Sequence, residues 1–296
     1  MSPLSSPWPQ RLSLMALWQR FPGKIVLTVL LVMVENALLV MIPLALGWGI
    51  DGVMAGSASG IWPLAILLVS VTLAVMVRRL YDTRAYGAIR VELGSEVGRR
   101  LASQPLSVRS ARLDMSRELV DFLENELPPL LTAIIQLLAA LIILSGFAWA
   151  LGAAALLTAL VMLGAYSLFH PRYRRLNHLI NRQQERQVRV LQQSSGESLL
   201  LHLVRLRHRE IQLSDTDALM YGLLYLMQFA FILANLMLAA IWVVQPSAGT
   251  LFAIVTYSWE FVEAAVMLPV ALQGVSRLQS ISARLMAVGS GAESAH

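Results

Sequence analysis

Three carboxylates lie in stretches of the sequence that are otherwise apolar: Glu35, Glu260 and Glu263. A charged residue at the centre of a bilayer costs about 2.5–3.5 kcal/mol of insertion free energy, so such residues face other helices or water. Glu260 and Glu263 are three residues apart and therefore share one face of a helix. No arginine or lysine lies inside these apolar stretches. We therefore expect the acids to be protonated, hydrogen-bonded, or matched by a cationic substrate or ion.

A stripe of polar side chains follows a second apolar stretch at heptad-like spacing and comprises Tyr221, Tyr225, Gln228 and Asn235. Glutamine and asparagine often hydrogen-bond between helices in membranes, which is the simpler explanation for Gln228 and Asn235. For the three acids we favour a role in a path across the membrane, since transporters tend to bind substrate near the midplane. The candidate path residues are Glu35, Gln228, Asn235, Tyr257, Glu260 and Glu263.

Several kinds of chemistry are not expected. The chain has no cysteine, and its five histidines show no metal-ligand spacing with carboxylates. No nucleophile lies beside a base in a catalytic pattern. The single lysine, Lys24, precedes Ile25 and does not follow a glycine-rich phosphate-binding sequence. We therefore expect no catalytic residue, metal or cofactor in this chain, and no ATP binding by it.

The composition is that of a membrane protein. Hydrophobic residues make up 57% of the 296, charged residues only 14%, and the mean hydropathy is +0.64. A helix needs about 20 apolar residues to cross the hydrocarbon core. Six stretches are long enough or nearly so, and we predict an all-α protein in the lipid bilayer with transmembrane helices at residues 25–46, 61–77, 130–149, 151–169, 221–244 and 251–272.

The basic residues indicate the orientation. Of 23, three lie at or before Lys24, nine between Arg78 and Arg117, nine between Arg172 and Arg209, and two near the C-terminus. The alternate loops, around residues 51–60, 150 and 245–249, contain none. By the positive-inside rule both termini are cytoplasmic, and we expect a multi-pass protein of the cell (inner) membrane. This orientation explains the net positive charge, so we do not expect nucleic acid as a partner.

The two long inner loops are predicted to be helical extensions of the spans. Residues 78–103 and 172–217 contain no proline, and 25 helical residues project about 35–40 Å. Each of these helical loops, called an excursion below, is predicted to break once, near Gln104-Pro105 in the first and near residues 194–196 in the second. A short element is expected to lie across the far end of each excursion. Solvated charged faces are the alternative, but two matched excursions favour a docking surface.

The predicted domain organisation is simple. Residues 11–21 form an amphipathic elbow helix on the inner leaflet. A single six-helix domain then covers residues 11–288, between flexible tails at 1–10 and 289–296.

Several motifs occur in an order that resembles the six-helix transmembrane domain of ABC exporters. They are Ile42-Pro43-Leu44 before Ile50-Asp51-Gly52, Tyr81 and Arg90 before Gln104-Pro105-Leu106, Glu118 to Asp121, Gly196-Glu197, and Gly249-Thr250 before Tyr257. The resemblance covers nearly the whole chain. It implies alternating access by a twelve-helix homodimer or heterodimer with another six-helix subunit. It also implies docking of an ATP-binding subunit on coupling segments that contain Pro105, Leu106, Arg109, Arg112, Glu197, Leu203, Arg207 and Glu210.

One departure from the family matters. Most such exporters carry an ATPase domain after the sixth helix, whereas these 296 residues contain no phosphate-binding loop. We therefore expect the ATPase to be a separate subunit, and ATP to act only through it. Two alternatives remain open at this stage: an accessory subunit that pairs with and regulates a complete exporter, and a proton-coupled carrier that uses the membrane carboxylates.

Overall fold

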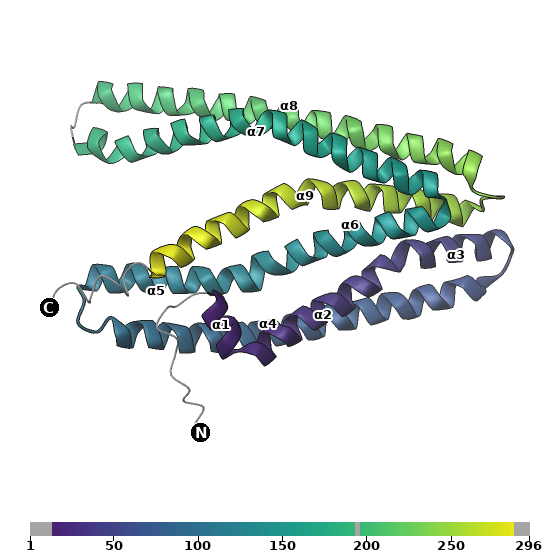
Figure 1. Ribbon diagram of the computed structural model, residues 1–296, viewed down its shortest axis with the longest axis horizontal. Coiled ribbons are helices and arrows are strands. Elements are labelled where there is room, and N and C mark those ends of the chain that lie inside the picture. The colour runs from purple at the N-terminus through teal and green to yellow at the C-terminus, as the bar shows by residue number, and fades with distance from the viewer. Residues whose placement is uncertain (1–13, 193–195, 287–296) are drawn as a thin grey trace. The chain divides into compact units, whose positions relative to one another are not determined.

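The structure, a computed structural model, describes residues 14–192 and 196–286 (Figure 1). All regular structure in these residues is helical, and six helical segments are long and apolar enough to cross a membrane. The predicted all-α, six-span fold class is therefore confirmed. In chain order the elements are α1 (Leu14–Arg20), α2 (Pro22–Val40), α3 (Ile42–Met54), η1 (Ala58–Gly60), α4 (Ile61–Arg100), α5 (Leu106–Asp121), η2 (Phe122–Glu126), α6 (Leu127–Phe147), α7 (Trp149–Gln192), α8 (Gly196–Trp242) and α9 (Ala248–Met286).

The chain divides into two compact units. Unit 1 consists of Met1–Ala140 together with Gln245–His296, and unit 2 of Leu141–Val244. The boundary falls within α6, and the chain returns to unit 1 just before α9. Unit 1 therefore holds the predicted first, second and sixth spans and most of the third, whereas unit 2 holds the fourth and fifth.

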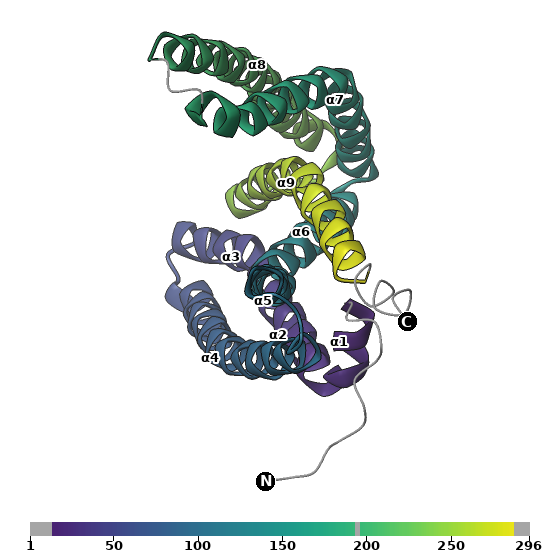
Figure 2. The same cartoon turned by 90° about the vertical axis from the view of Figure 1, so that its left-hand side faces the viewer.

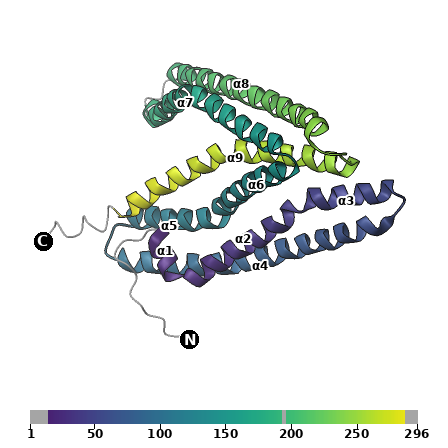
Figure 3. The same ribbon diagram turned by 45° about the vertical axis from the view of Figure 1, so that its right-hand side comes forward.

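The first predicted span is two helices rather than one. α2 ends at Val40 and α3 begins at Ile42, with Pro43 in the first turn of α3. Proline has no backbone N–H and clashes with the carbonyl four residues earlier, so it ends the preceding helix. Both helices pack along α4, and Figure 3 shows the short turn through η1 that joins α3 to α4.

The part of unit 1 around α1 has a hydrophobic core. In α1, Leu17 is 1% exposed whereas Met15 is 65% exposed, so one face of this short helix is buried. Figure 2 shows α1 beside α2 and α4. α1 falls within the predicted elbow helix. The core cluster comprises Leu17, Phe21, Ile25, Tyr86, Ile89, Leu93, Val97, Leu119, Val120, Phe122 and Leu123.

The first excursion breaks where it was predicted, but without a separate transverse element. α4 ends at Arg100, and Pro105 immediately precedes α5. α5 packs along α4 and continues through the π-helical η2 into α6. The expectation of a short element across the far end is wrong here because no proline interrupts the chain between Pro105 and Pro128.

Unit 2 is built on the antiparallel pair α7 and α8 (Figure 1). Its hairpin from α6 is tight: a Cβ atom on Gly152 would lie 1.9 Å from Ser145 Oγ, so only glycine fits. Trp149 and Trp242 stack edge to face at the same end of the unit, with ring centroids 5.2 Å apart. The predicted second break, at residues 194–196, falls largely outside the described residues.

Candidate functional site

Glu35 is held in an ionic network between α2 and α4. Arg78 donates to both carboxylate oxygens of Glu35, and its Nη1 donates to Asp82 Oδ2 at 3.1 Å. The side chains of Glu35, Arg78 and Asp82 are only 12%, 21% and 7% exposed. The expectation that no basic side chain neutralises the membrane acids is therefore wrong for Glu35.

The reason is a helix that continues beyond the apolar stretch. α4 is unbroken from Ile61 to Arg100, so Arg78 lies one residue past the predicted span and its long side chain turns back toward α2. Thr28 adds a hydrogen bond to Asp82 Oδ1 at 2.8 Å. Sequence reasoning missed Asp82 and Thr28. The four-residue spacing of Arg78 and Asp82 was the available signal.

Glu260 and Glu263 have a different environment. Both lie on α9, and Glu263 accepts a hydrogen bond from Trp259 Nε1 at 2.7 Å. Glu260 is half-buried, whereas Glu263 is exposed in the isolated chain. Among the described residues neither acid has a basic partner. These two acids therefore still lack the basic partner whose absence made them candidates for a path.

Tyr257 occupies a structural position. It is fully buried, and its hydroxyl donates to the carbonyl of Val40, the last residue of α2. Tyr257 thus lies at the helix break that Pro43 creates and joins α9 to it. Its predicted place among the path residues stays untested, but its hydroxyl is already engaged.

Asp51 fastens the opposite end of α3 to the start of α9. Its carboxylate accepts from Ser247 Oγ at 2.6 Å and from the backbone N–H of Gly249 at 2.8 Å. Negative charge at a helix N-terminus is favourable because the helix dipole is positive there. The backbones of Gly47 and Gly249 also meet closely: a Cβ on Gly249 would lie 2.0 Å from the Gly47 carbonyl oxygen.

The polar stripe lies in unit 2. Gln228 and Asn235 are on α8 and are 3% and 0% exposed. The amide nitrogen of Gln228 is buried and has no hydrogen-bond partner in the described part of the chain. Tyr221 and Tyr225 of the same stripe are exposed. Within the residues described, the structure groups the three acids in unit 1 and these two amides in unit 2.

The long membrane helices with their helical extensions coincide with a family match. Residues 14–249 match the model of a family described as the ABC transporter transmembrane region. The chain belongs to this family. A comparison with curated proteins finds no match. The match covers α1 to α8 and the first residues of α9, and it confirms the resemblance drawn from the sequence.

The predicted coupling segments of this ABC transporter transmembrane region are partly exposed. Leu106 is 79% exposed at the first turn of α5, directly after Pro105. Arg109 and Arg112 are half-buried on the same helix, and Arg112 Nη1 lies 3.8 Å from Met115 Sδ. In the second segment Leu203, Arg207 and Glu210 are exposed on α8, whereas the side chain of Glu197 lies outside the described part of the structure.

Several arginines of α4 are paired with acids. Arg90 donates to Asp121 and to Glu124, the latter at 2.8 Å, on either side of the start of η2. At the end of α4, Glu96 accepts from Arg99 and Arg100. Burial raises the pKa of Glu96, but the hydrogen bonds from the two arginines outweigh it and hold that pKa below its ordinary value. The α4 end is thus fixed by satisfied ion pairs.

Proposed function

We propose that this chain is the transmembrane, or permease, subunit of an ABC-type exporter that forms the substrate translocation path. The observation that carries the proposal is the family match over residues 14–249 on a chain with six membrane-length helices. The path would use the α9 face that bears Glu260 and Glu263. A cationic or amine-bearing substrate would supply the positive charge that these acids lack.

The α9 acids also support a dimer with a second six-helix subunit. Glu263 is exposed and Trp259 is 41% exposed in the single chain, so this face would meet lipid if nothing covered it. An exposed carboxylate at the bilayer centre is unfavourable by about 2.5–3.5 kcal/mol. A partner subunit and a water-filled path between the two chains remove that cost. We propose a twelve-helix assembly in the cell membrane with both termini cytoplasmic.

ATP binding is proposed to come from a partner. The 296 residues contain no phosphate-binding loop, so the nucleotide site of an ABC system must lie outside them. We propose that a separately encoded ATPase docks on the coupling segments, with Leu106 as an apolar contact. This chain itself would then be neither an enzyme nor a cofactor-binding protein.

Copurification with a matched pair of variants tests docking. We expect Leu106→Asp to abolish copurification of the ATPase subunit in mild detergent, because a charge replaces an exposed apolar contact. Val91→Asp is the control, since Val91 is 74% exposed on α4 but lies outside the predicted segments. Equal retention of the ATPase by both variants would refute docking through Leu106.

Transport by proteoliposomes separates the candidate functions. ATP-dependent, vanadate-sensitive transport by the complex, with no hydrolysis by the isolated chain, is the expected result. A proton-coupled carrier is the second candidate, because Glu260 has no basic partner among the described residues. Transport that is abolished by a protonophore and indifferent to ATP would favour that carrier. Copurification of a complete half-exporter without transport by this chain would favour an accessory role.

A further inference from the structure

A cavity lies between α7 and α8 in unit 2, in the part of these helices that follows one predicted span and precedes the next. Its volume is about 560 Å³, within the 300–1,000 Å³ range of small-molecule sites. We name it the α7–α8 pocket. Its lining residues are Leu179, Arg182, Gln183, Val204, Arg205, His208 and Arg209.

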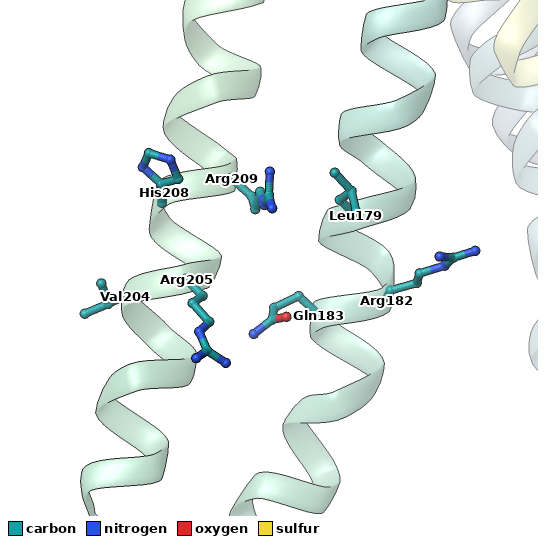
Figure 4. Close-up of a pocket in the computed structure, with 7 residues that line it drawn as sticks. All are labelled: Leu179, Arg182, Gln183, Val204, Arg205, His208 and Arg209. Atoms are coloured by element: carbon teal, nitrogen blue, oxygen red, sulfur yellow. The ribbon is translucent and has the colours of Figure 1, made fainter.

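The α7–α8 pocket is basic. Among the side chains that the structure describes, three guanidinium groups and an imidazole line it, and no carboxylate does. Figure 4 shows Arg205 and Arg209 on the side of α8 that faces α7, opposite Gln183 and Leu179, whereas Arg182 points away from the gap. Arg205 and Arg209 are four residues apart, so two like charges occupy adjacent turns of one helix face. Like charges at this spacing weakly repel each other, and an anion bound between them would remove that repulsion.

These arginines differ from the paired arginines of α4. Arg78, Arg90 and Arg99 each pair with an acid within unit 1. Within the described ranges, neither Arg205 nor Arg209 forms an ion pair, and Arg209 donates only to Gln212 Oε1, at 3.2 Å. The pocket therefore presents guanidinium donors without an acidic partner from the described chain.

The predicted span boundaries place the pocket beyond the lipid headgroups. Arg205 precedes the predicted start of the fifth span, residue 221, by 16 residues, which is about 24 Å of helix. The headgroup layer adds only about 5–8 Å to each side of the hydrocarbon core. Even a tilted helix keeps Arg205 well beyond that layer. We therefore infer that the ligand comes from the aqueous phase.

We propose that the α7–α8 pocket binds a soluble phosphate-bearing anion. A phosphate group carries up to two negative charges and offers several acceptor oxygens, which match two guanidinium forks. Gln183 adds a neutral amide whose Nε2 also lies 3.1 Å from His202 Nδ1, and Leu179 provides an apolar wall for the remainder of the molecule. This site belongs to the chain itself and does not depend on the proposed transport function, so the failure of one would leave the other unaffected.

Calorimetry with pyrophosphate and AMP tests this proposal. The full chain is purified free of other proteins and placed in phosphatidylcholine nanodiscs, so that no ATPase subunit contributes to binding. We expect saturable binding of at least one probe that weakens with salt. Arg205→Gln combined with Arg209→Gln should reduce the affinity at least tenfold, because hydrogen bonds to charged groups are lost.

A charge-matched variant provides the control. Arg174→Gln combined with Arg175→Gln removes the same charge from exposed positions of α7 outside the pocket, and its affinity should stay within about twofold of the original. If the glutamine pair at 205 and 209 fails to fold, Arg205→Lys with Arg209→Lys keeps the charge and should still weaken binding because the fork is lost. The proposal would be overturned if the glutamine pair at 174 and 175 lost as much affinity as the glutamine pair at 205 and 209. It would also be overturned if the chain showed no saturable binding at all. Competition by phosphatidylglycerol nanodiscs would overturn it as well, and would identify lipid as the occupant.

Discussion

At the scale of single residues, Arg78 pairs with two largely buried carboxylates. These are Glu35 and Asp82, whose side chains are 12% and 7% exposed. Removal of one partner from a buried ionic network leaves uncompensated charge and costs about 3–5 kcal/mol. We expect Arg78→Gln to fall near the low end of that range, because Arg78 is 21% exposed. The thermal unfolding midpoint in detergent should drop by several degrees.

The neighbouring arginine is a matched control for this prediction. Arg79 is exposed, so Arg79→Gln should leave the unfolding midpoint nearly unchanged. The double variant Glu35→Gln with Arg78→Gln should recover part of the loss, since Asp82 still has Thr28 as a donor. Equal midpoints for the variants at 78 and 79 would mean that the network contributes little to stability.

The acids of α9 should respond differently from Glu35. Glu260→Gln and Glu263→Gln preserve side-chain shape, and the amide oxygen at 263 can still accept from Trp259. We expect both variants to keep their unfolding midpoint but to lose transport of a cationic substrate at least tenfold, because a desolvated cation loses its counter-charge. Glu35→Gln should instead lower the midpoint. Normal transport by both α9 variants would leave these acids as packing elements.

At the scale of helices, the close contact between α3 and α9 depends on glycine. A Cβ on Gly249 would lie 2.0 Å from the Gly47 carbonyl oxygen and 2.6 Å from Asp51 Oδ2. Gly249→Ala must therefore displace backbone and disturb the hydrogen bonds of Asp51. Overpacking of this kind costs about 1–3 kcal/mol, which a lower thermal unfolding midpoint would report.

Another glycine serves as the control for this contact. Gly87 lies inside α4, and a Cβ at this position would have nothing within 4 Å, so Gly87→Ala should be neutral or stabilise the helix by up to about 1 kcal/mol. A Gly249→Ala variant as stable as Gly87→Ala would show that α3 and α9 do not pack closely in the membrane.

At the scale of the whole molecule, the sequence predicted what depends on local composition. Apolar runs predicted the six spans, since hydropathy is a property of each segment alone. Contacts between distant segments could not be predicted in this way. Asp51 bonds to Ser247, 196 residues later, and Arg78 reaches Glu35 across 43 residues. A span boundary placed at residue 77 hid the second contact, because the helix and its long side chain extend past the apolar run.

The contact between Asp51 and Ser247 also makes the membrane topology testable by two independent arguments. The absence of basic residues near 51–60 and 245–249 predicts that both loops are external. The 2.6 Å hydrogen bond separately requires that the two loops share one side of the membrane, whichever side that is. Reporter fusions after Ser57 and Ser247 should therefore both read as external, and fusions after Arg109 and Arg189 as cytoplasmic. Opposite signals at Ser57 and Ser247 would contradict the fold of unit 1, whereas a cytoplasmic signal at both would reverse the orientation but leave that fold intact.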